Sequence, residues 1–146
     1  MRRYLWVVTV LMLGWSGSVM LAQKVSSPQG LDKVMKNAGR ASATISKAIG
    51  TKQYADIKSQ LPVLRQAVRD SQGFWAEKRK DDGVKFANDV LTKIDDLEKT
   101  LAIEAPDKAT VANAYDAMSG ACRNCHRVYR ATDEENNFVI KAGTLN

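Results

Sequence analysis

Four stretches of the chain carry apolar residues at helical spacing, and this repeated pattern restricts the possible folds more than any other feature. In the second stretch, Tyr54, Ile57, Leu61, Leu64 and Val68 follow one another in steps of 3, 4, 3 and 4 residues, which places them on one face of a helix. No alternating pattern indicates a β-strand. Four amphipathic helices with short connections predict an all-α fold, an antiparallel four-helix bundle.

Capping residues and helix breakers predict where the first two helices begin and end. The first helix is predicted over residues 28–49, with Ser27 as its N-cap and Gly50 as its stop signal. The second is predicted over residues 52–71. Because a proline inside a helix removes a hydrogen-bond donor and clashes with the preceding turn, Pro62 predicts a kink or a break in this helix.

The second half of the chain supplies the other two helices. Residues 71–75, SQGFW, are expected to interrupt the second helix, and residues 77–83, EKRKDDG, to form a solvated connection. Either Asp81 or Asp82 is expected to cap the third helix, which ends in the sequence IEAPD. Pro106 and Asp107 start the fourth helix.

The N-terminus has the composition of an export signal. A basic start precedes residues 4–22, which carry no charge and end in small residues around Ala22. An uncleaved membrane anchor is the alternative, because the run is almost long enough to span a bilayer. A cleaved signal over residues 1–22 is favoured because its apolar core is short, which leaves one domain over residues 23–146 with a loose tail over residues 131–146.

The net charge argues against a nucleic-acid partner. Loss of residues 1–22, with their two arginines, lowers the formal charge from +6 to +4. The remaining positive charge is spread over many segments, and no basic stripe is interleaved with aromatic residues as in nucleic-acid-binding proteins.

All the soft-ligand chemistry of the chain lies within five residues. Cys122, Cys125 and His126 include both cysteines and the only histidine. The motif C-x-x-C-H is the attachment signal for c-type haem. On a helix, Cys125 lies about 300° and His126 about 40° around the axis from Cys122, so all three side chains point to one side. We therefore expect one covalent haem c near the end of the fourth helix, with two thioether bonds and His126 as an axial iron ligand.

Other interpretations of the motif fit less well. A thioredoxin-like C-x-x-C requires a βαβ context, which the helical pattern lacks. A structural zinc site requires four Cys or His ligands, whereas the chain has three such residues. A haem-free helical interaction module would make the motif a chance occurrence.

The sequence resembles class II cytochromes c, the cytochrome c prime family and its low-spin, methionine-ligated relatives. The resemblance covers about residues 28–131 and depends on the pattern CxxCHxxYR at residues 122–130 and on VMKNAGRASATI at residues 34–45. It implies that Met35 points at the far face of the haem and that Arg130 lies by the proximal face. It also implies attachment outside the cytoplasm by the cytochrome c maturation machinery, redox partner proteins in the periplasm and a homodimer through the first two helices.

Two functions follow from the state of Met35. A low-spin electron carrier needs a second strong axial ligand, usually Met or His. Met118 lies on the helix of His126, eight residues earlier, and cannot reach the opposite haem face, which leaves Met35. If Met35 binds, the protein is a periplasmic one-electron carrier. If it does not, the iron is five-coordinate with an open apolar site for nitric oxide or carbon monoxide. No enzymatic activity is expected, because no spare histidine, catalytic cysteine or acid/base pair lies near the motif.

The sequence also predicts where Phe74, Trp75 and Gly120 lie relative to the haem. Phe74 and Trp75 resemble aromatic residues that cover the haem region in some class II relatives. Gly120 inside the fourth helix costs about 1 kcal/mol relative to alanine, so it predicts a close approach of the haem or of another helix.

Overall fold

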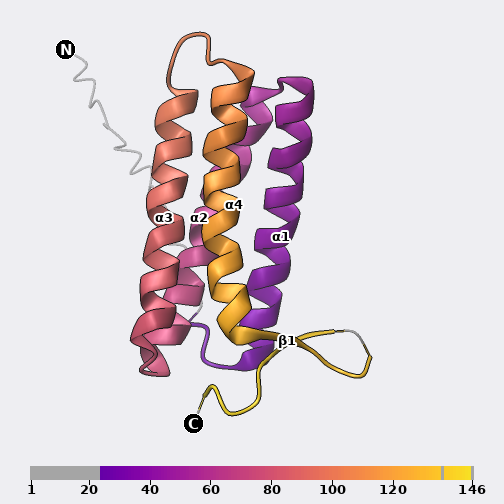
Figure 1. The fold of residues 1–146 in the computed structure, drawn as a ribbon, viewed down its shortest axis with the longest axis vertical. Coiled ribbons are helices and arrows are strands. Elements are labelled where there is room, and N and C mark those ends of the chain that lie inside the picture. Colours follow the sequence, from indigo (N-terminus) through magenta and orange to yellow (C-terminus); the bar gives the residue numbers. More distant parts are fainter. Residues whose placement is uncertain (1–23, 136, 146) are drawn as a thin grey trace, which may run out of the picture.

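Four helices and a short hairpin make up the part of the chain that the computed structural model describes, residues 24–135 and 137–145. The helices run up and down in sequence order, and the hairpin lies at the end of α4 (Figure 1). The elements are α1 (Pro28–Thr51), α2 (Tyr54–Glu77), α3 (Asp81–Leu101), α4 (Lys108–Tyr129), β1 (Arg130–Thr132) and β2 (Phe138–Ile140). The predicted four-helix bundle is confirmed.

The expected export signal, residues 1–22, lies outside the described residues. Among the helices that the structure does describe, none has the length and apolar character needed to cross a membrane.

Helix α1 begins at the predicted cap but runs past the predicted stop. The hydroxyl of Ser27 accepts a hydrogen bond from the backbone N–H of Gly30 at 3.0 Å. Gly50 is helical, and the left-handed residue that ends the helix is Lys52, with φ of 57°. The stop therefore comes two residues later than the glycine predicted, because the C-terminal turn uses Lys52 in the conformation that glycine usually adopts.

Helix α2 runs through Pro62 without a break, so that part of the prediction is wrong. Pro62 is exposed, whereas Leu61 and Leu64 on either side of it are each 2% exposed. The proline ring therefore faces solvent, and burial of the two leucines in the core favours a continuous helix at this point.

The predicted interruption at residues 71–75 is also helical. Ser71, Phe74 and Trp75 are buried, so the apolar face of α2 continues for another turn and a half beyond the predicted end. The chain reverses after Glu77, in a tight connection where Arg79 has a positive φ of 56°.

Acidic residues mark the starts of α3 and α4 in different ways. Lys80 occupies the N-cap position of α3, so neither Asp81 nor Asp82 caps it. Both lie in its first turn, where a negative charge is favourable next to the helix dipole. Asp107 does cap α4 as predicted, because its carboxylate accepts a hydrogen bond from the N–H of Thr110 at 2.9 Å.

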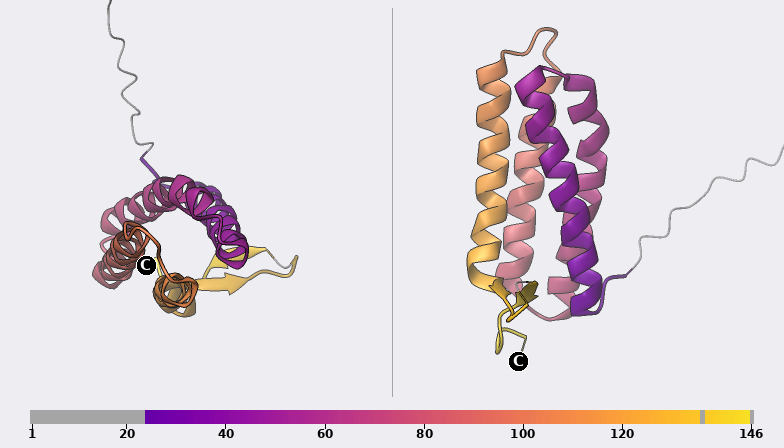
Figure 2. Two further views of the ribbon diagram at one scale, coloured as in Figure 1. Left: turned by 90° about the horizontal axis from the view of Figure 1, so that it is seen from above. Right: turned by 90° about the vertical axis from the view of Figure 1, so that its right-hand side faces the viewer.

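Successive helices pack side by side, whereas the first and last are only loosely associated. Helix α1 packs on α2, α2 on α3 and α3 on α4, whereas α1 and α4 contact each other much less. Seen from above, the helices follow an arc (Figure 2). The hydroxyl of Tyr115 on α4 joins the two helices, since it donates to the carbonyl of Ser42 at 3.1 Å and lies 2.9 Å from its hydroxyl.

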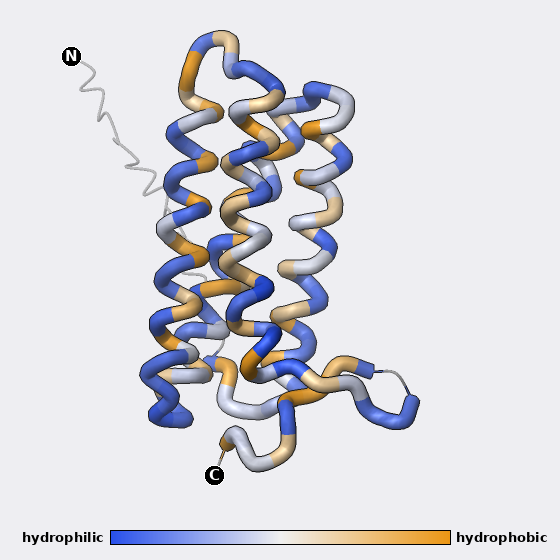
Figure 3. The backbone as a smooth tube through the Cα atoms, in the orientation of Figure 1, coloured by the Kyte–Doolittle hydropathy of each residue, from blue (hydrophilic) through white to orange (hydrophobic). Residues whose placement is uncertain are grey.

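Two apolar clusters fill the bundle, and hydrophobic and hydrophilic residues recur in turn along each helix (Figure 3). The large cluster follows the length of the bundle and includes Ile45, Ile57, Leu64, Ile94, Leu97 and Met118. The small cluster lies apart from it. Its buried members are Leu31, Phe74, Trp75 and Tyr129, and partly buried residues packed against it include Met35, Phe86, Cys125 and Ile140.

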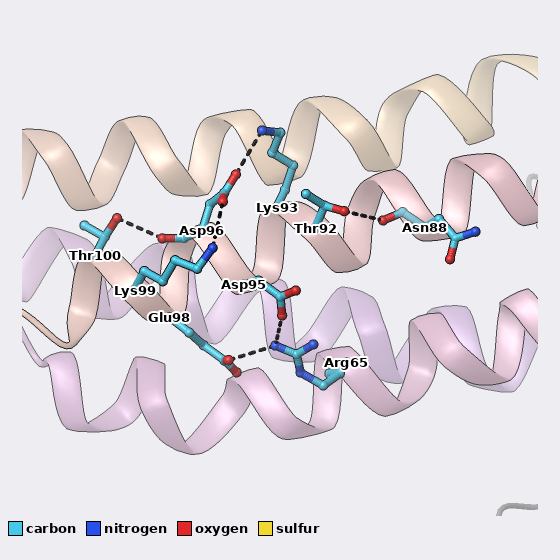
Figure 4. A network of polar contacts seen from close by, with 9 residues as sticks. All are labelled: Arg65, Asn88, Thr92, Lys93, Asp95, Asp96, Glu98, Lys99 and Thr100. Atoms are coloured by element: carbon cyan, nitrogen blue, oxygen red, sulfur yellow. Dashed lines mark hydrogen bonds and ion pairs between the residues drawn. The ribbon is translucent and has the colours of Figure 1, made fainter.

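A polar bridge ties α2 to α3 on the outside of the bundle. One guanidinium nitrogen of Arg65 lies 2.6 Å from a carboxylate oxygen of Asp95 and 2.8 Å from one of Glu98 (Figure 4). The side chain of Arg65 is only 19% exposed, so its stem packs against the helices while its charge is met by two carboxylates.

The tail that the sequence predicts to be loose contains an antiparallel hairpin. Strand β1 follows the last residue of α4 directly, and the N–H of Lys141 donates to the carbonyl of Tyr129 at 2.8 Å. At the other end, Asp133 accepts a hydrogen bond from the N–H of Asn137 at 2.7 Å. The paired residues are Arg130 with Ile140, Ala131 with Val139 and Thr132 with Phe138.

Candidate functional site

The last two turns of α4 carry the C-x-x-C-H motif as the sequence predicts. Cys122, Cys125 and His126 are all half-buried. Cys122 packs against the large apolar cluster, and Cys125 packs against the small one. One turn of helix therefore presents its two thiols to the bundle interior at neighbouring levels.

Burial keeps both thiols protonated. It raises the pKa of the Cys122 thiol. For Cys125, burial together with the nearby Cys122 and the carboxylate of Asp82 raises the pKa to about 11. Redox-active C-x-x-C pairs work through a lowered thiol pKa, so this environment is unlike theirs.

The imidazole of His126 is held in its neutral form. Burial lowers the pKa of His126, and the positive charge of Arg130 lowers it further. Neutral imidazole is the form that binds a metal. Within residues 24–135 and 137–145, no hydrogen bond occupies either ring nitrogen, so both are available to a ligand or to water.

Met35 lies on α1 and belongs to the same small cluster as Cys125 on α4. It is half-buried, whereas Met118 is fully buried in the large cluster. The structure thus brings Met35 and the C-x-x-C-H motif to one end of the bundle and leaves Met118 as a core residue.

The chemistry of this donor set fits a c-type haem. Two neutral thiols stand one turn apart on α4 with a neutral imidazole one residue further on, and the thioether of Met35 on α1 packs against the same cluster as Cys125. A metal held by protein side chains alone fits less well, because no group of three or more Cys, His, Asp or Glu that could hold an ion occurs in the described part of the chain.

Arg130 occupies the C-cap of α4, next to the motif. Its guanidinium carbon lies 4.1 Å from the centre of the Phe138 ring, which is a cation–π contact between the two strands of the hairpin. Its charge is close enough to His126 to lower the pKa of the imidazole. The structure therefore places Arg130 near His126, and its position by the proximal face of a haem stays a prediction.

The aromatic residues predicted as cover for the site are buried next to it. Phe74 and Trp75 are 0% and 2% exposed and meet edge to face, with ring centroids 4.9 Å apart. The ring of Trp75 lies 4.1 Å from that of Tyr129, measured between centroids. Three aromatic side chains from two helices thus exclude water from the cluster that contains Cys125.

Sequence analysis does not reveal the contacts that Asp82 and Gly83 make with this cluster. The hydroxyl of Tyr129 donates a short hydrogen bond to a carboxylate oxygen of Asp82, which links the end of α4 to the start of α3. Gly83 lies against Trp75, and a Cβ atom there would approach Cγ of the indole to 2.6 Å. A glycine in the first turn of a helix is the signal that could have revealed this contact.

Gly120 does not mark the close approach of another helix. A Cβ atom at this position would meet only a guanidinium nitrogen of Arg123, at an ordinary distance of 3.6 Å. The prediction of another helix packed closely against it is wrong, whereas the alternative, a close approach of the haem, stays a prediction. Gly120 instead lines the surface groove that borders His126.

In comparisons with known proteins, no family model, no curated protein and no solved structure matches this chain.

Proposed function

We propose that the protein is a c-type haem protein related to class II cytochromes c and that it carries one electron at a time in the periplasm. In this proposal Cys122 and Cys125 hold the haem, His126 is the proximal iron ligand and Met35 is the distal one. The observation that carries the proposal is the shared cluster at one end of the bundle. It brings a thioether from α1 to the level of the motif on α4.

When bound, haem would supply an iron that gains and loses one electron. The residues of the chain would tether it, orient it and keep it dry. The two thiols would bind it covalently, so that it cannot dissociate. Phe74 and Trp75 would exclude water, and a low local dielectric with a methionine ligand raises a haem reduction potential. Burial, together with the charge of Arg130, would keep His126 neutral and able to donate an electron pair to the metal.

A gas-binding protein is the second candidate, and the hydrogen bond from Tyr129 to Asp82 supports a preference for gases that need no hydrogen-bond donor. If Met35 does not bind the iron, its neighbours on α1, Leu31, Val34 and Ala38, would offer an apolar distal side without a hydrogen-bond donor. The hydroxyl of Tyr129 in the same cluster is already used by Asp82. Such a site would favour nitric oxide or carbon monoxide over oxygen, which is stabilised by a hydrogen-bond donor.

Absorption spectra of Met35→Leu and Met118→Leu decide between these functions. Both substitutions remove a thioether at nearly constant volume, so each should cost less than about 1.5 kcal/mol of stability. The mature chain is made in a host that attaches c-type haem, and spectra are recorded oxidised, reduced, and reduced under carbon monoxide. For a carrier, the wild type and Met118→Leu are low-spin and indifferent to carbon monoxide, whereas Met35→Leu becomes high-spin and binds it.

Other results would contradict one or both candidates. If Met35→Leu has the low-spin spectra of the wild type, Met35 is not the ligand. If the wild type is already high-spin and binds carbon monoxide, the gas-binding function replaces electron transfer. If no haem band is present in the wild type, both functions are wrong. The homodimer through α1 and α2 stays a prediction, which sedimentation analysis of the mature chain tests.

A further inference from the structure

A concave, basic surface borders His126 at the end of the bundle. The groove has a volume of about 580 Å³, and its lining includes His126, Arg123, Arg127, Arg130 and Phe138. The last two turns of α4 and both strands of the hairpin form it. We call this surface the arginine groove.

The positive charge of the arginine groove is not balanced by its surroundings. Arg123 donates to the hydroxyl of Ser119 at 2.9 Å, and Arg127 donates to the side-chain oxygen of Asn124. Across the described residues, neither of these arginines nor Arg130 forms an ion pair with a carboxylate, and no lining residue of the groove is acidic.

The acidic residues nearest in sequence lie away from the groove. Asp133, Glu134 and Glu135 follow strand β1, in the turn of the hairpin, which extends away from the bundle (Figure 1). Asp133 is engaged by hydrogen bonds from Asn137. These carboxylates do not line the groove, so its arginines face solvent as a patch of one sign.

The groove also contains an apolar anchor of the kind found in protein interfaces. The side chain of Phe138 is 57% exposed, although the guanidinium of Arg130 stacks on its ring at 4.1 Å. Aromatic residues and arginine are the residues that most often dominate binding energy at protein–protein contacts. A planar guanidinium also binds carboxylates through two parallel hydrogen bonds, which gives geometric selectivity.

We propose that the arginine groove is the docking surface for an acidic protein partner that exchanges electrons with this chain. This inference rests on the proposed function, because it concerns the partner of the same site. His126 lines the groove, so a partner seated there lies beside the proposed iron ligand and has a short path for the electron. The complementary charge speeds the encounter, and the geometry of the groove selects the orientation.

The shape of the surface favours a protein partner over an anionic membrane. A bilayer is flat on the scale of this groove and cannot bring headgroups to its floor without distortion. A protruding loop or helix end with carboxylates can enter a concavity of about 580 Å³. A membrane is therefore treated as the competing outcome in the test.

The test compares two charge-matched double variants of the mature, haem-loaded protein. The groove variant is Arg123→Gln with Arg127→Gln, and Arg130 is left intact because it adjoins the proposed ligand. The control is Lys47→Gln with Lys58→Gln, two exposed lysines on α1 and α2. Both variants lose the same formal charge, so a difference between them reports the location of the charge.

The probe for binding is a fluorescent poly-L-glutamate peptide, and its affinity is measured by anisotropy over a range of ionic strength. One pair of opposite charges at about 4 Å in water contributes about a fivefold factor, so the groove variant should bind on the order of thirtyfold more weakly at low salt. Screening should reduce this difference as salt rises. The control should lose only a few-fold, because its charges are distant.

A second measurement is the rate of electron transfer. Stopped-flow oxidation of the reduced protein is measured with hexacyanoferrate(III), which is anionic, and with tris(phenanthroline)cobalt(III), which is cationic. The groove variant should lose much of the rate with the anion and gain rate with the cation, whereas the control should change little with either. The absorption spectrum of each variant should match that of the wild type, which shows that the haem site is intact.

The possible failures are distinguishable. If the chain carries no haem, the proposed function fails, and this inference, which depends on it, fails as well. If haem is present but the groove variant binds the peptide and reacts with the anion like the control, only the docking surface is wrong. If phosphatidylglycerol vesicles retain the wild type but not the groove variant, and the peptide does not bind, the surface faces a membrane and the inference is overturned.

Discussion

Substituting alanine for Gly83 should destabilise the protein, although most glycine-to-alanine changes in helices do the opposite. The new Cβ atom would lie 2.6 Å from Cγ, 2.8 Å from Cδ2 and 2.9 Å from Cβ of Trp75. Trp75 is 2% exposed and packs against the rings of Phe74 and Tyr129. The indole therefore cannot retreat without moving the cluster that contains Cys125.

The expected size of the effect follows from two opposing contributions. Adding a methyl group to a well-packed core costs about 1–3 kcal/mol. Replacing glycine by alanine in a helix returns up to about 1 kcal/mol by reducing the entropy of the unfolded chain. We therefore expect Gly83→Ala to lower the free energy of unfolding by about 1–2 kcal/mol.

Gly39→Ala is the matched control. Gly39 lies inside α1, and a Cβ atom there would meet no atom within 4 Å. This variant should be more stable than the wild type by about 0.5–1 kcal/mol, because only the entropy contribution remains. The two substitutions are chemically identical, so their opposite signs isolate the contact with Trp75.

Urea unfolding followed by far-ultraviolet circular dichroism measures both changes. Trp75 is the only tryptophan between residues 23 and 146, so its fluorescence reports in the same samples whether the indole has moved. The reasoning is refuted if Gly83→Ala equals or exceeds the wild type in stability with an unchanged emission spectrum. That result would mean that Trp75 does not occupy the space above Gly83.

Two further predictions concern polar contacts between helices. Tyr129→Phe should cost about 1 kcal/mol in urea unfolding, because it removes one hydrogen bond and leaves the exposed carboxylate of Asp82 to water. Burial, followed by the hydrogen bond to Asp82, raises the pKa of Tyr129. The free energy of unfolding should therefore fall as pH rises above about 10, because the unfolded chain loses the phenol proton first, and it should fall less in Tyr129→Phe. Equal slopes of unfolding free energy against pH in the two proteins would contradict this assignment. Arg65→Met should cost about 1 kcal/mol at low salt and less at high salt, since it keeps the packed stem but loses the pairs with Asp95 and Glu98; a cost independent of salt would show that packing alone is responsible.

The helices were predictable because their apolar periodicity records which face is buried. The four segments, the cap at Ser27 and the cap at Asp107 all appear where the sequence places them. Burial in the core outweighs local breaker signals, and this explains the errors in α2. The sequence predicts a kink or a break at Pro62 because the apolar periodicity alone does not show that the proline ring faces solvent. The sequence predicts an interruption at residues 71–75, where the buried face of α2 is formed by the aromatic residues Phe74 and Trp75 at the end of the bundle.

The hairpin was missed because its strands are short and mostly exposed. Strand β2 reads Phe138, Val139 and Ile140, of which only Ile140 is half-buried, so no alternation of apolar and polar residues marks it. The available signal was three β-forming residues after a polar stretch with turn-forming residues such as Asp133 and Asn137. This signal is weak, since the stabilising contacts come from β1 and from the end of α4.

The candidate site also contains some residues that the sequence predicts and others that depend on how the helices pack. Cys122, Cys125 and His126 were found from the sequence because their spacing is local, and a helix fixes their relative directions. Met35 and Cys125 pack against the same cluster because of how α1 lies near α4. The sequence indicates this position of Met35 only indirectly, by elimination of Met118. Asp82 and Gly83 could not be found in this way, because their contacts with Tyr129 and Trp75 come from other helices.

The hairpin has a consequence for self-association. Both of its strands are edges, with backbone groups that another chain could pair with, and such edges are sites where proteins aggregate. Here each strand is only three residues long, and the ladder ends at Arg130, with Lys141 immediately after it. Two copies paired in parallel along this edge would place like charges side by side, whereas antiparallel pairing would set Arg130 of one copy toward the acidic turn of the other, which contains Asp133, Glu134 and Glu135. The shortness of the two strands is therefore what limits pairing along this edge, since three residues offer few backbone groups to a second chain.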